Sequence, residues 1–207
     1  MTTDTGTQTA QSSTDIASTE QVELGHFAIH PDVERVLVTG QQLDERNAQL
    51  GAAISRDYAD KEVLVVGVLK GAAWFVADLT RHMNCDFTVD FMAVSSYGAA
   101  HKSSGVVRIL KDLEVPLEGK HVLIAEDILD TGLTLKYLIR NFLGRGAASV
   151  EVAACVVKEG AQEEDIDVRY AGFSLPNEFV VGYGLDYDQH YRGLPYIGVL
   201  RPSVYGE

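Results

Sequence analysis

Cysteine is scarce in this 207-residue chain, which contains only Cys85 and Cys155. The two thiols are far apart in the sequence, and neither has another thiol or a pair of histidines beside it. The sequence therefore excludes a disulfide framework and a cysteine-based zinc site. This thiol usage is typical of a reducing compartment, and we expect the protein to be cytoplasmic.

Long hydrophobic runs and an excess of basic residues are also missing. The longest apolar runs, such as residues 63–69, are much shorter than the roughly 20 residues that a membrane-spanning helix needs, so we expect no membrane segment. Seventeen Lys and Arg face thirty Asp and Glu, which gives a formal net charge of −13. A surface of this sign repels phosphate backbones and anionic lipids, so we expect no nucleic-acid partner.

The start of the chain has neither basic residues nor an apolar stretch. Residues 1–24 are rich in Thr, Ser and Gln and contain no Lys or Arg, which fits neither a secretory signal nor a mitochondrial presequence. We expect residues 1–24 to form a disordered acidic tail. The remaining residues 25–207 are expected to form a single domain, because the chain is 46% hydrophobic and long enough for one sizeable core.

Helical and strand-like patterns alternate along this domain. Thr39 and Gln42 can form a capping box, and the apolar residues that follow recur at helical spacing as far as Tyr58. Further on, the patterns predict strands at 62–68, 87–97, 106–110, 121–125 and 149–157, and helices at 72–83 and 133–143. The alternation predicts an α/β fold with a largely parallel sheet. Residues 168–200, with short strands and aromatics, are expected to form a small lobe over one edge of the sheet.

The segment 121–135 carries the clearest chemical signal. A buried strand leads into the acidic pair Glu126 and Asp127, and an Asp-Thr-Gly-x-Thr sequence then opens a helix. The free N–H groups of residues 131–134 at a helix N-terminus favour a phosphate, and Gly132 permits close approach. Neighbouring carboxylates suit ribose hydroxyls or a bridging Mg²⁺, so the pattern indicates a sugar phosphate as ligand.

Each candidate residue also has a simpler interpretation. Asp130 or Thr131 could be an ordinary helix cap. Lys70 could be a solvated lysine, and Ser96 with Tyr97 could simply end a strand. Lys158 could be a surface lysine and Phe179 a core aromatic.

Several motifs together resemble one known family. Residues 122–135 resemble the phosphoribosyl-pyrophosphate (PRPP) motif of the type I phosphoribosyltransferases, and the Glu-Asp-Ile-x-Asp-Thr-Gly stretch resembles the hypoxanthine-guanine branch. The resemblance covers about residues 30–205 in the family's order. It extends to a pyrophosphate loop at Leu69-Lys70-Gly71 and to a mobile catalytic loop at Ser96-Tyr97. It also includes a base-selecting lysine, Lys158, and C-terminal substrate contacts at residues 179–186 and Arg192.

The resemblance implies both a fold and an activity. The fold would be an α/β type I phosphoribosyltransferase-like core with a largely parallel sheet flanked by helices, and a small hood from the N- and C-terminal segments. The activity would be purine salvage, in which the 5-phosphoribosyl group moves from PRPP to hypoxanthine or guanine to give IMP or GMP and pyrophosphate. Mg²⁺ is the implied cofactor, and relatives suggest a homodimer or homotetramer.

The resemblance also implies a role for each site residue. Asp130 would act as general base toward N7 of the purine, while Ser96 and Tyr97 would close over PRPP. The PRPP contacts would be Leu69, Lys70, Gly71, Glu126, Asp127, Asp130, Thr131, Gly132, Leu133, Thr134 and Arg192. The purine contacts would be Lys158, Phe179, Val180 and Asp186, and Mg²⁺ would be held by Glu126, Asp127 and Asp186.

Two alternatives and one departure accompany this interpretation. A regulatory nucleic-acid-binding protein on the same fold is disfavoured by the net charge of −13. The second alternative is a transferase for another base, such as xanthine or a pyrimidine. The residues from Lys158 to Asp186, which would contact the base, distinguish such an enzyme from one for hypoxanthine and guanine. The departure is the acidic segment 159–167, which follows Lys158 where relatives tend to carry a further basic residue. These acids could draw the ammonium group of Lys158 outward.

Overall fold

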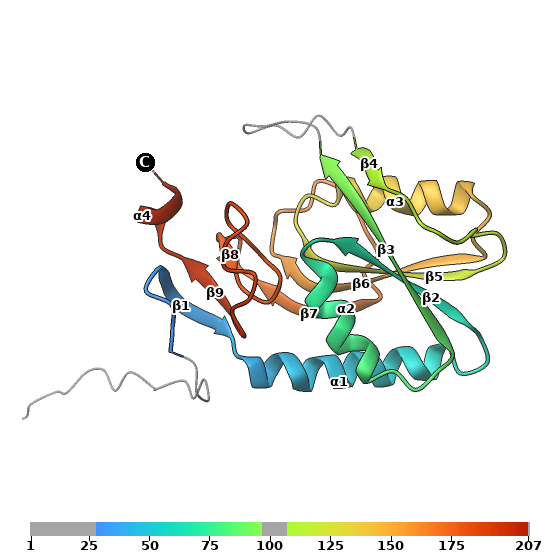
Figure 1. The fold of residues 1–207 in the computed structure, drawn as a ribbon, viewed down its shortest axis with the longest axis horizontal. Helices are drawn as coiled ribbons and strands as arrows, with labels where there is room; N and C mark the ends of the chain where they lie inside the picture. Colours follow the sequence, from blue (N-terminus) through green and yellow to red (C-terminus); the bar gives the residue numbers. More distant parts are fainter. Residues whose placement is uncertain (1–27, 97–106, 207) are drawn as a thin grey trace, which may run out of the picture.

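The computed structural model describes residues 28–96 and 107–206 (Figure 1). The expected acidic tail, and Tyr97 of the expected catalytic loop with the residues after it up to 106, lie outside the described residues. Ser96 is described only as the last residue of a strand.

The larger sheet of the described chain has six strands in the order β4-β3-β2-β5-β6-β7. All neighbours are parallel except β3 and β4, which confirms the predicted largely parallel sheet. The strands are β2 (Val63–Leu69), β3 (Phe87–Ser96), β4 (Val107–Lys111), β5 (His121–Leu129), β6 (Ser149–Lys158) and β7 (Tyr170–Leu175).

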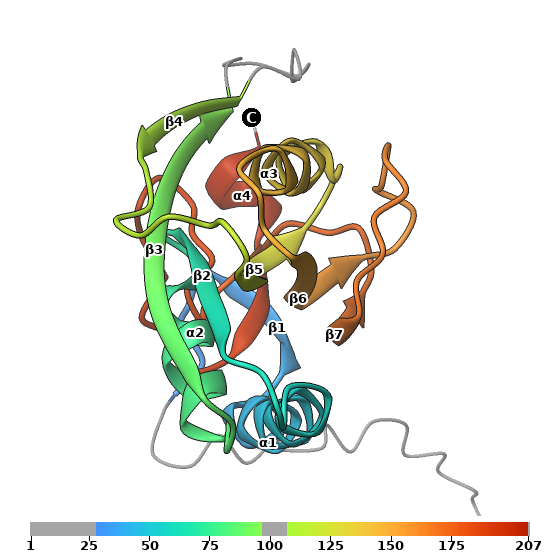
Figure 2. The same ribbon diagram turned by 90° about the vertical axis from the view of Figure 1, so that its right-hand side faces the viewer.

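Three helices, α1 (Gly40–Asp57), α2 (Ala72–Arg81) and α3 (Leu133–Gly144), cover the two faces of the sheet (Figure 2). Along the chain, α2 lies between β2 and β3, α3 between β5 and β6, and α1 just before β2. The predicted capping box is confirmed, because Thr39 Oγ1 accepts from the Gln42 N–H and Gln42 Oε1 accepts from the Thr39 N–H. No helix in the described ranges is long and apolar enough to cross a membrane.

The alternation of side chains along β5 divides the core into two layers. Leu123 and Ala125 belong to the cluster packed with α1 and α2, whereas Val122 and Ile124 belong to the cluster packed with α3. All four are fully buried. A strand covered on both faces reads as a continuous apolar run, which is why the sequence predicted it.

A second, antiparallel sheet forms the smaller lobe, in the order β1-β9-β8. It combines β1 (Val33–Val38) with β8 (Val180–Val181) and β9 (Ile197–Leu200), and is followed by α4 (Pro202–Tyr205). The expected hood from the N- and C-terminal segments is therefore present (Figure 1). Val181, Tyr196 and Leu200 are buried in its own small core.

The prediction that residues 168–200 all belong to this lobe is wrong for β7. β7 is the edge strand of the larger sheet and pairs in parallel with β6, from Tyr170 beside Ala153 to Leu175 beside Lys158. Glycine at position 172 permits this close pairing, because a Cβ there would lie only 2.2 Å from the Cys155 carbonyl oxygen.

Candidate active site

The candidate site lies where the parallel strands of the larger sheet end. Lys70 follows β2, Asp130 follows β5, and Lys158 is the last residue of β6. Because β2, β5 and β6 are parallel neighbours, their carboxyl ends lie side by side along one edge of the sheet, the edge where the strands end. Open α/β sheets bind ligands at this edge. The loop between β8 and β9 faces these strand ends, so that a ligand would lie between the sheet and the lobe.

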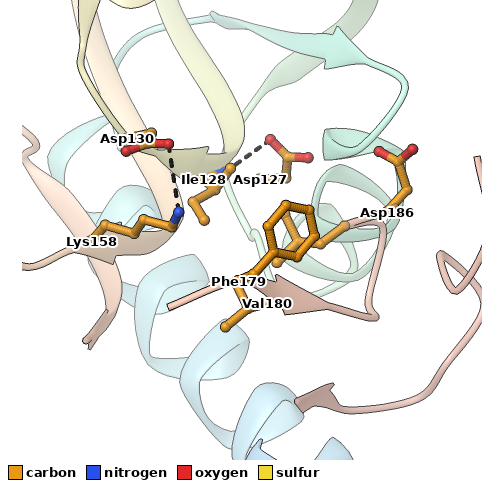
Figure 3. A pocket seen from close by; sticks show the side chains of 8 residues that line it. Asp127, Ile128, Asp130, Lys158, Phe179, Val180 and Asp186 are labelled. Carbon is orange, nitrogen blue, oxygen red and sulfur yellow. Dashed lines mark hydrogen bonds and ion pairs between the residues drawn. The ribbon is translucent and has the colours of Figure 1, made fainter. Parts of the chain in front are cut away.

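A cavity of about 220 Å³ opens at this edge (Figure 3). Its walls come from the end of β5, the end of β6 and the lobe: Asp127, Ile128, Asp130, Lys158, Phe179, Val180, Leu185 and Asp186. The structure therefore brings together all four residues expected to contact the purine. Ile128 and Leu185 lie within the two predicted motifs, 122–135 and 179–186, but were given no role of their own; they supply apolar surface.

Lys158 points into this cavity rather than toward the acidic segment that follows it. Its Nζ lies 3.5 Å from Asp130 Oδ2, and its side chain is only 14% exposed. Within the described ranges this is its one ion pair. The possibility that the acidic segment draws Lys158 outward is thus wrong for this structure. Asp130 remains 53% exposed and open to a ligand.

Phe179 is held by two tyrosines that sequence reasoning missed. Its ring stacks on Tyr205, with centroids 4.8 Å apart, and lies nearly perpendicular to the ring of Tyr187, with centroids 5.6 Å apart. Tyr205 comes from α4, after the last strand, so no local pattern linked it to Phe179. The two rings orient Phe179 at the cavity wall.

The loop before α3 has the form of an anion site. Gly132, with φ of 83°, is the residue before the first helical turn, and no side chain in the described part of the chain caps the helix. Asp130 and Thr131 are therefore not helix caps. Among the described residues, the N–H groups of Thr131, Gly132, Leu133 and Thr134 have no hydrogen-bond acceptor. Such free donors at a helix N-terminus bind phosphate groups well.

Asp127 is packed directly against the turn after β2. A Cβ added at Gly71 would lie 1.5 Å from Asp127 Oδ2, and a Cβ at Gly184 would lie 2.1 Å from the Gly71 carbonyl oxygen. Burial raises the pKa of Asp127 to about 6, although the Ile128 N–H and the charge of Arg192 partly oppose that rise. The carboxylate is thus fixed in place and receptive to a positive partner.

Basic groups and amides gather beside Asp127. Arg192 pairs with Asp186 at 2.8 Å and donates to the Gly184 carbonyl at 2.6 Å. Lys70 Nζ donates to Gln189 Oε1 at 2.8 Å. Leu69, the last residue of β2, is joined to Lys70 by a cis peptide bond. This cluster joins the turn after β2 to the lobe and suits an anion such as pyrophosphate.

Gln189 is a site residue that the sequence did not indicate. Its backbone has a φ of 68°, its Oε1 accepts from Lys70 Nζ, and its N–H donates to Asp186 Oδ2 at 2.8 Å. A glutamine in an irregular loop carries no periodic signal. Only the folded lobe shows that it bridges Lys70 and Asp186.

Among the residues that the structure describes, Glu126 presents a buried acceptor without a hydrogen-bond partner. Its Oε2 is inaccessible and unpaired, and burial, together with the charge of Asp127, raises its pKa well above the usual value. The described residues contain no group of three His, Cys, Asp or Glu placed to hold a metal. The acidic pair therefore fits a cation that takes most of its ligands from substrate oxygens and water, as Mg²⁺ does.

Comparison with known proteins agrees with this geometry. Residues 37–188 match the phosphoribosyl transferase domain model. The chain is 47% identical to the hypoxanthine-guanine phosphoribosyltransferase of Bacillus subtilis, over 84% of this chain and 97% of that protein. It is 48% identical to the Mycobacterium tuberculosis protein of the same name, over 84% of this chain and 89% of that one.

A solved structure agrees as well. The hypoxanthine phosphoribosyltransferase of Staphylococcus aureus superposes with a TM-score of 0.83 at 44% identity, covering 85% of this chain and 96% of that one. This chain therefore belongs to the phosphoribosyltransferase family, within its hypoxanthine-guanine branch.

Proposed function

We propose that the protein is a purine salvage enzyme that transfers the 5-phosphoribosyl group of PRPP to N9 of hypoxanthine or guanine. The products are IMP or GMP and pyrophosphate. The observation that carries this proposal is the position of Lys158 and Phe179 in one cavity with Asp130, directly before the free N–H groups of residues 131–134. A base and a sugar phosphate can therefore be bound side by side.

The purine end of the site is suited to a 6-oxopurine. Lys158 supplies a charged donor for the 6-oxo acceptor, and Phe179 supplies an aromatic surface for the base. The 6-amino group of adenine is itself a donor and would leave Lys158 without an acceptor. Val180 and Asp186 line the same cavity, where their backbone would meet the 2-position.

The PRPP end of the site stabilises charge that develops during transfer. As the C1–O bond breaks, negative charge builds on pyrophosphate, and Lys70 and Arg192 would neutralise it. Glu126 and Asp127 would hold the ribose hydroxyls. Asp130 would accept a proton from the purine at N7. The expected closing roles of Ser96 and Tyr97 remain predictions, since Tyr97 lies outside the described residues.

We also propose Mg²⁺ as cofactor, bound mainly through substrate oxygens and water. Glu126, Asp127 and Asp186 are the residues that would contact it, directly or through water, because among the described residues they do not form one three-ligand group. When bound, this cation would neutralise phosphate charge. The unpaired Glu126 Oε2 and the raised pKa of Asp127 support a cation at this position.

The assembly and location of the enzyme complete the proposal. We infer that it works in the cytoplasm as a homodimer or homotetramer, with residues 25–207 as its single domain and residues 1–24 as a tail. The two free cysteines support a reducing location. Light scattering coupled to size-exclusion chromatography would distinguish these assemblies from a monomer.

Product analysis tests the proposed reaction. The protein is incubated with PRPP, Mg²⁺ and either hypoxanthine or guanine, and the products are separated by ion-exchange chromatography. We expect IMP or GMP and pyrophosphate in equal amounts. A protein that consumes PRPP without forming a nucleotide from either base would contradict the proposal.

Replacement of Lys158 tests base selection. Lys158→Ala should lower kcat/KM for hypoxanthine and guanine by a similar factor of about 10 to 150, because each loses a charge-assisted hydrogen bond. The KM for PRPP should change little. Steady-state kinetics with hypoxanthine and adenine decide the matter, and an unchanged ratio of the two kcat/KM values would place base selection elsewhere. Lys120→Ala is the matched control, since Lys120 faces Glu62 away from the site.

Replacement of Thr134 tests the phosphate loop. Thr134→Val keeps the side-chain shape but removes a hydroxyl donor to the 5′-phosphate, so PRPP should bind about 10- to 150-fold more weakly. The purine KM should change much less. Calorimetric titration with PRPP measures the effect. Thr80→Val serves as control, because that hydroxyl donates to the Val76 carbonyl within α2; equal effects on both substrates would place Thr134 away from the phosphate.

A further inference from the structure

The acidic segment 159–167 contacts the phosphate loop from outside the catalytic cavity. We call this segment the acidic strap; it joins β6 to β7. The N–H groups of Glu163 and Glu164 both donate to the Thr131 carbonyl, at 3.0 and 3.2 Å. The strap therefore binds the backbone of the loop whose other side bears the free N–H groups.

These two hydrogen bonds fix the orientation of one peptide group. In a trans peptide, the Thr131 carbonyl and the Gly132 N–H point in opposite directions. With the carbonyl held by the strap, the Gly132 N–H is directed away from it, toward the expected phosphate. The first turn of α3 does not compete, because the Lys136 N–H bonds to the Gly132 carbonyl at 2.9 Å.

Side chains hold the strap in this position. The ammonium group of Lys136 on α3 pairs with the Glu164 carboxylate. Ile166 packs against the core cluster under α3, and a Cβ at Gly132 would lie 3.1 Å from Ile166 Cγ1. One ion pair and one apolar contact therefore fasten the strap beside Gly132.

We infer that Glu164 and Ile166 are positioning residues that hold the strap on Thr131 and so keep the Gly132 N–H aimed at the 5′-phosphate of PRPP. This inference rests on the proposed function and deepens it. Neither side chain belongs to the catalytic cavity, so both act through the loop.

The direction in which PRPP affinity changes in the variants distinguishes positioning from simple electrostatics. Removing a carboxylate near an anionic substrate should strengthen binding if charge alone matters. Positioning predicts the opposite for Glu164, whose carboxylate holds Lys136, and no effect for Glu163, whose side chain is exposed. Ile166 carries no charge, so Ile166→Ala tests positioning alone.

The experiment compares Glu164→Gln and Ile166→Ala with the control Glu163→Gln in the full-length enzyme. Steady-state kinetics give KM for PRPP and for hypoxanthine, and calorimetry gives melting temperatures. We expect Glu164→Gln and Ile166→Ala to raise KM for PRPP by about 5- to 50-fold, since small displacements of binding groups cost up to about 10². KM for hypoxanthine should stay within about twofold, and Glu163→Gln should match wild type.

Two results would overturn the inference. One is an unchanged or lower KM for PRPP in both test variants. The other is an equal rise of both KM values together with a lower melting temperature, which is the pattern of general destabilisation. Titration with ribose 5-phosphate repeats the comparison without catalysis, so a wild-type protein that binds this probe but forms no nucleotide would contradict the proposed function and not the strap.

Discussion

Asp130→Asn is expected to lower kcat by about 10²- to 10⁴-fold, the usual contribution of a positioned acid–base group. Asparagine has nearly the same shape as aspartate but cannot accept the proton from N7 of the purine. Asp130 lies at the cavity wall beside Lys158 and is 53% exposed, so a ligand can reach its carboxylate. PRPP binding should remain close to wild type.

Initial rates measure kcat, and calorimetric titration with PRPP measures PRPP affinity separately. Loss of a helix cap does not complicate this variant, because Gly132 and not Asp130 precedes α3. Asp165→Asn makes the same chemical change on the exposed surface of the strap and should leave kcat unaltered. If Asp130→Asn retains kcat within twofold of wild type, Asp130 is not the general base.

Gly71→Ala is expected to weaken PRPP binding by about 10- to 150-fold, equivalent to the loss of one hydrogen bond to a charged group. The added Cβ would lie 1.5 Å from Asp127 Oδ2 and 2.5 Å from its Cγ, so the carboxylate has to move. Asp127 would then no longer be placed to hold the ribose hydroxyls. The clash involves one side chain, so the fold itself should survive.

Kinetics in PRPP and a melting curve test this variant together. Gly144→Ala is the matched control, because a Cβ there meets no atom within 4 Å. Asp127→Asn should reproduce the loss of PRPP affinity without adding any atom at the turn. A folded Gly71→Ala enzyme with wild-type KM for PRPP would show that Asp127 does not contact the substrate.

The parts of the site that are local in sequence could be predicted. Residues 121–135 contain both the apolar run of a strand covered on two faces and the polar turn that opens α3. The Thr39 capping box is equally local, since its two residues are three positions apart. Such features depend on neighbours in the chain, which a single sequence displays.

The parts that depend on distant pairing could not be predicted from local sequence patterns, and the joining of N- and C-terminal segments in the hood was expected only from the family resemblance. β1 is a short strand whose partner, β9, lies near the other end of the chain. The place of β7 in the larger sheet depends on its close approach to β6 at Gly172. The contact of Lys158 with Asp130 likewise arises only when two parallel strands end side by side. None of these contacts leaves a periodic signal.

A crystal structure of the enzyme with GMP would show directly which residues bind the base and the phosphate. We predict the 5′-phosphate on the N–H groups of residues 131–134, the base against Phe179, and its 6-oxo group within hydrogen-bond distance of Lys158 Nζ. The larger cavity of about 550 Å³ between the acidic strap and the end of the sheet should stay free of nucleotide. GMP bound in that cavity, or bound with its base away from Lys158, would contradict the proposed roles of these residues.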